Sequence, residues 1–202
     1  GSLHDRGNAR SGRERFHQLL LAKDRDGYRN LMKLSSVGYL EGFYYKPRID
    51  KEILASHSQG LIATSSCLSG EVPQHLLRGD SEGARAALVE LVDIFGHDNV
   101  YVELQDQGLP EQQQINPELI RLAGELELPL IATNDCHYLL QADARAHDAL
   151  LCIQTGKAMS EPQRMKFPNN QFYVKTPEEM WKVFAEVPEA LVNTEKVAER
   201  CN

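Results

Sequence analysis

Short apolar runs alternate with amphipathic helical patterns along most of the chain, and this alternation limits the possible folds more than any other feature. We predict four strands, at 15–22, 60–66, 99–105 and 128–133. Apolar residues between these runs recur every three or four positions, which indicates helices. Strand–helix repetition of this kind is typical of parallel strands joined by crossover helices. An open doubly wound sheet and a piece of a barrel both fit this α/β pattern.

Local signals place the helices between and after these strands. The first helix should bury the face made of Tyr28, Leu31, Met32, Ser35 and Tyr39. Asp80 is a candidate N-cap for a second helix, which Gly96 would end. The apolar face of that second helix consists of Ala84, Ala87, Leu88, Leu91 and Phe95. Asn116 and Pro117 are predicted to open the next helix, and residues 142–156 form another.

The last part of the sequence differs from the strand–helix series. Residues 160–175 are polar, with Pro and Asn, which indicates a linker or a flap. Thr176, Pro177 and Glu179 then supply an N-cap, a first-turn proline and a capping-box glutamate. Pro188 interrupts the pattern before one more helix. We therefore predict a C-terminal helical extension.

Composition narrows the class of protein. With 22 Lys and Arg against 29 Asp and Glu, the net charge is −7, whereas a domain that binds nucleic acid by itself is more often basic. No apolar run has the length of a membrane span, and no export signal opens the chain. The four cysteines include no Cys-x-x-Cys pair, which argues against a zinc ribbon or a thioredoxin-type site. From their low density and the absence of an export signal we expect reduced thiols and a cytoplasmic location without membrane contact.

Polar side chains follow the predicted strands where ligands of parallel strand–helix folds collect. The fourth strand ends in Asp135 and His137, which would point to one side, while Cys136 would face the helix layer as a small apolar residue. Cys67 follows the second strand, and His17 lies in the first. This set of His, Cys, Asp and His suits zinc, with manganese or iron as alternatives.

Each candidate also has a purely structural interpretation. Asp135 could simply cap the following helix, Cys67 could be a buried apolar residue, and His17 could be a core histidine. For His147 a structural hydrogen bond within its helix is the better explanation. Glu103 either supports the site from behind or is solvated. The sequence does not identify a general base.

Several long blocks, in one order, carry a resemblance to a known family. They include HQLLLAKDRDGYRNLMKLSS, GLIATSSCLSGEVPQHLL, VYVELQDQGLPEQQQIN, LIATNDCHYL and FYVKTPEEMWKVFAEVPEALVNTEKVAERC. Together they resemble the alpha subunit of bacterial replicative DNA polymerase III, in its polymerase and histidinol phosphatase (PHP) domain. The resemblance implies a distorted (β/α)7 barrel, similar to a TIM barrel, with up to three metal ions at the strand ends.

The matching metal-binding positions are His17, Cys67, Asp135 and His137. In some members the metal cluster depends on zinc and supports a 3′–5′ exonuclease, and in others the domain is structural. The family's earlier ligands, including a His-x-His, have no match in this sequence. We therefore expect the later part of the barrel, with an incomplete nuclease centre that is inactive by itself.

The resemblance also divides the chain and suggests partners. Residues 1–158 would be the PHP part, and residues 159–202 a linker and helices leading toward the polymerase palm. The parent would be a DNA-directed DNA polymerase that contacts DNA and other holoenzyme subunits, including a proofreading subunit. The alternative is a non-catalytic scaffold that stabilises the polymerase and its proofreading partner. A free-standing phosphatase would leave the C-terminal helices unexplained.

Overall fold

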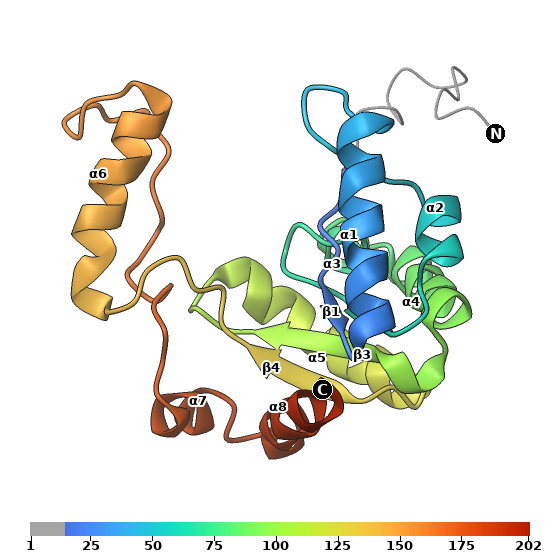
Figure 1. Cartoon of the computed structure of the whole chain (residues 1–202). Coiled ribbons are helices and arrows are strands. Elements are labelled where there is room, and N and C mark those ends of the chain that lie inside the picture. The colour runs from blue at the N-terminus through green and yellow to red at the C-terminus, as the bar shows by residue number, and fades with distance from the viewer. Residues whose placement is uncertain (1–14) are drawn as a thin grey trace.

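The computed structural model describes residues 15–202, and its centre is a four-stranded sheet (Figure 1). The strands, in their order across the sheet, are β1 (Leu20–Ala22), β2 (Leu61–Thr64), β3 (Val100–Gln105) and β4 (Leu130–Thr133). β2, β3 and β4 run parallel, which confirms the α/β class. Over the described residues the sheet is open, with β1 and β4 at its edges.

The first strand differs from its prediction in length and direction. β1 begins only at Leu20 and pairs antiparallel with β2, with Leu20 opposite Ala63. The preceding His17 forms an isolated bridge with Gly70 and donates its backbone N–H to Ser69 O at 2.9 Å. Because β1 runs in the opposite direction, the residues before it, and not after it, lie at the carboxyl end of β2.

Three helices pack against one face of the sheet: α3 (Glu71–Leu77), α4 (Ser81–Phe95) and α5 (Pro110–Glu125). The prediction for α4 is confirmed in detail. Asp80 Oδ1 accepts from Gly83 N at 2.9 Å, all five predicted inward residues are buried, and Gly96 ends the helix with a φ of 80°. A short 3₁₀ turn, η2 (His97–Asn99), then leads into β3.

The start predicted for α5 is wrong. The helix begins at Pro110 and Pro117 lies inside it, since one missing backbone donor does not outweigh the buried apolar face. Asn116 Nδ2 donates to Gln105 O at 3.1 Å, which ties the middle of α5 to the end of β3.

The inward face predicted for α1 (Arg25–Leu40) is also wrong. Four of its five predicted side chains are exposed, namely Tyr28, Met32, Ser35 and Tyr39. The helix instead buries Gly27, Leu34, Val37 and Gly38. A Cβ atom at Gly27 would clash with the carbonyl oxygen of Gly60, so glycine permits a backbone contact that fixes the rotation of α1. The small α2 (Lys51–Ser56) follows, capped by Asp50.

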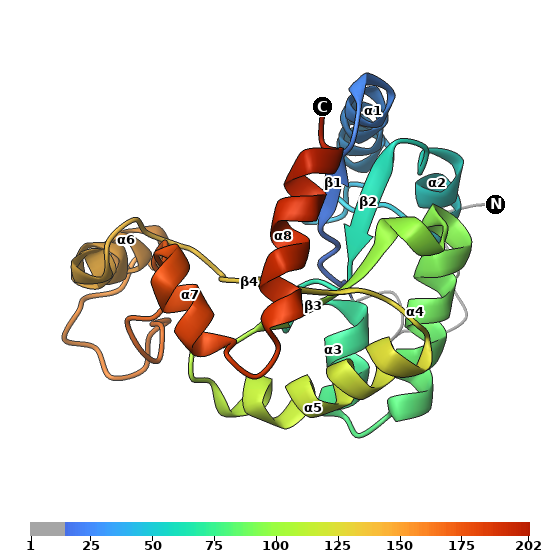
Figure 2. The same ribbon diagram turned by 90° about the horizontal axis from the view of Figure 1, so that it is seen from below.

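The C-terminal helix α8 (Pro188–Arg200) lies alongside β4 and β3 (Figure 2). Its Val197 packs with Ile62, Tyr101 and Ile131 on the second face of the sheet. Asn193 Nδ2 donates to Leu130 O at 2.7 Å and so satisfies a carbonyl of the edge strand. The tail therefore shares the core of the sheet, and the domain division after residue 158 stays a prediction.

Between β4 and α8 the chain forms a projecting segment, residues 134–176, which we call the arm (Figure 1). It contains the turn η3 (Gln141–Asp143) and α6 (Ala144–Thr155). The arm leads into α7 (Pro177–Val183), whose predicted capping box is present between Thr176 and Glu179. No helix within residues 15–202 combines the length and the apolar character needed to cross a bilayer.

Candidate metal site

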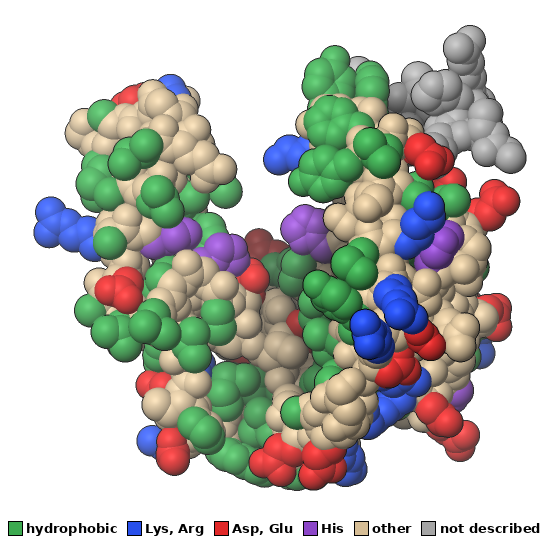
Figure 3. Space-filling view, viewed as in Figure 1, with side chains coloured by type: hydrophobic (Ala, Val, Ile, Leu, Met, Phe, Trp, Pro, Cys, Tyr) green, Lys and Arg blue, Asp and Glu red, His purple; other side chains and the backbone are tan. Residues whose placement is uncertain are grey.

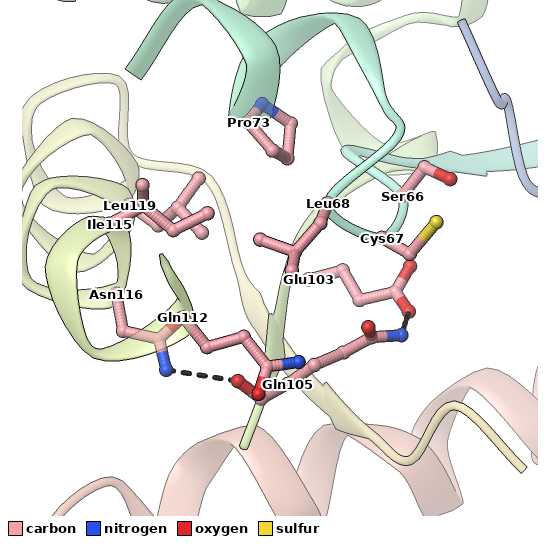
Figure 4. A pocket seen from close by; sticks show the side chains of 10 residues that line it. All are labelled: Ser66, Cys67, Leu68, Pro73, Glu103, Gln105, Gln112, Ile115, Asn116 and Leu119. Carbon is pink, nitrogen blue, oxygen red and sulfur yellow. Dashed lines mark hydrogen bonds between the residues drawn. The ribbon is translucent and has the colours of Figure 1, made fainter. Parts of the chain in front are cut away.

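The predicted ligands lie beyond the carboxyl ends of β2 and β4. The backbone of Ser66, just after β2, has a φ of 67°, a left-handed conformation that turns the chain out of the strand direction at Cys67. Cys67 lines a small pocket together with Glu103 and Gln105 of β3 (Figure 4). This end of the sheet therefore gathers a thiol and polar side chains from neighbouring strands.

His17 and Cys67 form the first pair of candidate ligands. The imidazole Nδ1 of His17 lies 3.5 Å from the sulfur of Cys67, although 50 residues separate them in the sequence. The bridge between His17 and Gly70 and the bond from Gly70 N to Cys67 O at 2.7 Å hold the two segments together. The antiparallel course of β1 makes this pairing possible, because it places His17 beside the loop that follows β2.

Asp135 and His137 form the second pair. His137 Nδ1 lies 3.8 Å from Asp135 Oδ1 and 3.0 Å from the backbone oxygen of Asp135. A carbonyl oxygen only accepts hydrogen bonds, so Nδ1 must carry the proton in that contact. The lone pair of Nε2 is then free in the neutral ring, an arrangement usual for histidines that bind metals.

The returning part of the arm fixes the position of His137. Its backbone N–H donates to Phe172 O at 2.7 Å, and its ring centroid lies 4.6 Å from that of Phe167. Asn134 Nδ2 donates to Tyr173 O at 2.6 Å. Cys136 is exposed beside this contact, so the prediction that it faces the helix layer is wrong. The reason is that β4 ends at Thr133, and strand alternation does not continue to residue 136.

The structure thus brings the predicted ligands together as two pairs. Among residues 15–202, no three His, Cys, Asp or Glu side chains form a group that could hold a metal ion. Figure 3 shows histidine side chains on both walls of the hollow between the arm and the part of the molecule that carries α1. A single centre that uses all four residues stays a prediction.

Glu103 is a functional candidate whose environment the sequence did not reveal. Its side chain is buried, and the hydroxyls of Thr64 and Thr133 each donate to it at 2.5 Å. Gln105 Nε2 donates to the same carboxylate at 2.9 Å. The interpretation that Glu103 is solvated is therefore wrong. One signal was present: β2 and β4 both read Leu-Ile-Ala-Thr, and their threonines converge on the strand between them.

This network links the ends of the three parallel strands through one carboxylate. Fully satisfied buried networks of this kind make the surrounding structure rigid. Glu103 therefore sets the spacing between the loop that carries Cys67 and the segment that carries Asp135.

His147 does not make the hydrogen bond predicted for it within the described part of the chain. Its ring packs instead among aromatic rings, with centroid distances of 5.3 Å to Tyr138, 5.7 Å to His137 and 4.8 Å to Phe167. α6 and the returning part of the arm thus meet through rings next to a predicted metal ligand.

Comparison with known proteins identifies the family of the chain. The sequence model of the PHP domain matches residues 4–107, which is more than half of the chain. The chain belongs to the PHP domain family. The PHP domain described here is 48% identical over 201 residues to DNA polymerase III subunit alpha of Treponema pallidum and 48% identical over 206 residues to that of Deinococcus radiodurans. The identity to the same subunit of Thermus aquaticus is 49% over 190 residues.

These alignments cover 93% to 100% of the chain but only 15% to 17% of each relative. The predicted resemblance to the alpha subunit is confirmed. The open α/β sheet is consistent with part of the PHP barrel.

Proposed function

We propose that this PHP domain forms part of a DNA polymerase III alpha subunit, binds a metal centre, and supports 3′–5′ removal of nucleotides from DNA ends. The names of the relatives support the first part of the proposal. The position of His17 beside Cys67 carries the second part.

The separation of these two ligand atoms fits zinc. Zinc binds thiolate sulfur at about 2.3 Å and imidazole nitrogen at about 2.0 Å, so tetrahedral angles put the two atoms about 3.5 Å apart. The distance from Cys67 Sγ to His17 Nδ1 is 3.5 Å. A hydrogen bond between a thiol and an imidazole has the same separation, so zinc content, and not the distance, decides between the two. The sulfur ligand favours zinc over manganese or iron, which remain the alternatives for the Asp135–His137 pair.

The four side chains would divide the work of holding the metal centre. His17 and Cys67 supply the nitrogen and sulfur ligands, and Asp135 and His137 supply an oxygen and a second nitrogen. The chemistry that such metals supply is activation of water near neutral pH and neutralisation of charge on a phosphate. Glu103 would hold the strand ends in register without touching the reacting atoms.

The activity, location and partners of the parent protein follow from the proposed membership of a replicative polymerase. The parent protein would polymerise DNA in the cytoplasm and bind other holoenzyme subunits, including a proofreading subunit. We expect the chain by itself to be inactive as a nuclease, since its described residues provide only two pairs of ligands.

The test uses the full-length protein in which this domain occurs. Cys67→Ser and His137→Ala should each lower the zinc content of the protein, measured by plasma mass spectrometry. Each should also reduce 3′–5′ digestion of a labelled single strand by about tenfold or more. A loss of activity of roughly tenfold is the smallest expected when even a group that supports a metal ligand is removed. His57→Ala is the matched control, because among residues 15–202 the ring of His57 bonds only to Ser56 and Ile53 of the adjacent α2. Unchanged digestion in the His137→Ala protein would rule out the catalytic role.

A scaffold function is the second candidate, and the absence of a three-ligand group within residues 15–202 favours it. In that case chelation of the metal would lower the melting temperature while the intact protein leaves primer ends undigested. Restoration of digestion on return of zinc would exclude the scaffold as the sole function.

A further inference from the structure

A hollow of about 260 Å³ lies between α6 and the returning part of the arm. It is lined by Tyr138, Ala144, Arg145, His147, Asp148, Lys166, Phe167, Asn169 and Asn170. This volume is slightly below the roughly 300 Å³ at which pockets that enclose a whole small ligand begin, so the hollow has room for part of one nucleotide and not for a duplex.

Aromatic rings form one wall of this arm pocket. Tyr138, His147 and Phe167 line it, with His147 in contact with both of the other rings. His147 makes no hydrogen bond within the described chain, so its ring nitrogens remain available to a ligand. Flat aromatic surfaces of this kind bind nucleic-acid bases by stacking, whatever the base.

Two cations give the pocket a positive character in a chain whose net charge is −7. Arg145 and Lys166 line the pocket, and neither lies within salt-bridge distance of a carboxylate among residues 15–202, while the charge of Lys166 also helps to lower the pKa of Asp148. The one carboxylate in the lining, Asp148, receives two bonds from Arg164, at 2.5 Å and 2.7 Å. The hydrogen bonds from Arg164 hold the pKa of Asp148 below its usual value, so this carboxylate stays charged but is neutralised by its partner. An anionic group would therefore be attracted to the pocket.

Hydrogen bonds fix the position of Asn169 at the polar end of the pocket. Asn169 Nδ2 donates to Gln107 O at 2.7 Å, and Asn169 Oδ1 accepts from Gln171 N at 2.9 Å. The bond to Gln107 ties the returning part of the arm to the loop after β3, and the bond from Gln171 shapes the turn around Asn169. The amide nitrogen of Asn170 makes no bond to the residues described, so it can donate to a ligand.

The aromatic wall continues directly into the predicted metal site. His137 lies with its ring centroid 5.7 Å from that of His147 and 4.6 Å from that of Phe167. We propose that the arm pocket binds the terminal nucleotide of a single DNA strand, with its base against the aromatic wall and its phosphates near Arg145 and Lys166. The proposal rests on the proposed function and specifies where the substrate end lies.

The open hollow between the arm and the part that carries α1 leaves room for the rest of the strand (Figure 3). A free mononucleotide carries the same base and phosphate as the end of a DNA strand, so the experiment must distinguish these two ligands.

The first measurement is photocrosslinking to the full-length protein, because it requires binding but no digestion. An oligonucleotide with 5-iodouracil at its 3′ end should crosslink to peptides that contain Tyr138, His147 or Phe167, as identified by mass spectrometry. A crosslink confined to other regions would overturn the proposal. Labelling by 5-iodo-dUMP without labelling by the oligonucleotide would also overturn it.

The second measurement is the kinetics of 3′ digestion. The double variant Arg145→Glu, Lys166→Glu should raise KM for a single strand about tenfold, with kcat and zinc content unchanged. Lys33→Glu, an exposed charge reversal on α1, is the control. An unchanged KM in the double variant would refute the pocket while leaving the nuclease intact. If digestion and zinc are both absent and the crosslink still forms, the pocket stands and the nuclease proposal fails.

Discussion

The body of the molecule, made of the sheet and its packed helices, is stabilised differently from the arm. In the body, Leu88, Val102 and Leu122 are completely buried. In the arm, Leu150 and Ile153 of α6 are 59% and 79% exposed. The body therefore holds itself together by apolar burial, which supplies most of the stability of a fold.

The arm is held by a small cluster of aromatic rings around Phe167 and by a few polar contacts at its base and across its middle. Its base is tied by Asn134, whose side-chain amide donates to Tyr173 O, and by the backbone bond from His137 to Phe172. Arg164 joins the returning segment to α6 through Asp148. The comparison shows that one half of the candidate site rests on the rigid body, whereas the other half rests on a segment with few buried contacts.

The largest expected effect separates the two regions directly. Leu88→Ala in the full-length protein should lower the local free energy of unfolding by about 3 kcal/mol, because it leaves a cavity between α4 and the sheet. Leu150→Ala on α6 should change it by less than about 0.5 kcal/mol. Hydrogen exchange of β3 peptides, followed by mass spectrometry, measures both. Equal acceleration by the two substitutions would mean that the body and the arm unfold together.

An intermediate effect is expected at the network that connects the body to the site. Glu103→Ala leaves the hydroxyls of Thr64 and Thr133 without their acceptor and should destabilise the strand ends by about 2 to 4 kcal/mol. Glu103→Gln keeps one acceptor oxygen and should cost roughly 1 kcal/mol.

Zinc content provides a second measurement for the Glu103 variants. A packing defect confined to the strands would leave the zinc content unchanged, whereas displaced ligands would lower it. We expect reduced zinc in Glu103→Ala even at a temperature where the sheet remains folded. Full zinc occupancy under those conditions would show that the network stabilises the strands without positioning the ligands.

The smallest effect concerns the arm alone. Arg164→Ala removes the paired bonds to Asp148 and should speed trypsin cleavage after the exposed Lys166 on the order of tenfold. Lys157→Ala is the control, because its bond to Glu161 is exposed and lies within one turn of chain. Exchange of β3 should be the same in both variants. Faster β3 exchange in Arg164→Ala would contradict the independence of arm and body.

Much of the fold could be predicted where the signal is local. The cap at Asp80 and the capping box at Thr176 were both identified because these bonds join residues three positions apart. The start of α5 was misassigned, since Pro117 is usual at a helix start but is tolerated inside a helix that packs well. The rotation of α1 was also missed, because it depends on the contact of Gly27 with Gly60, a residue far away in the sequence.

The candidate site also has features that the sequence predicts and features that it does not. Asp135 and His137 could be proposed as neighbours from their spacing alone, and the structure pairs them. The strand pattern placed His17 and Cys67 in one ligand set, but their direct contact depends on the antiparallel course of β1, which the pattern did not predict. The buried state of Glu103 was not foreseen, because a charged residue in a strand normally faces solvent.

By itself, the sequence determined the α/β class, the helix caps and the PHP family, all of which are encoded in short-range patterns or in the order of matching blocks. Only the tertiary structure decided that β1 runs antiparallel, that α8 packs along β4, and that the threonines of β2 and β4 share one carboxylate. The physical reason is that strand direction and helix rotation are set by backbone contacts and burial between distant segments. Strand direction leaves no periodic trace in the residues, and the trace that helix rotation leaves can be overridden by a close backbone contact, as at Gly27.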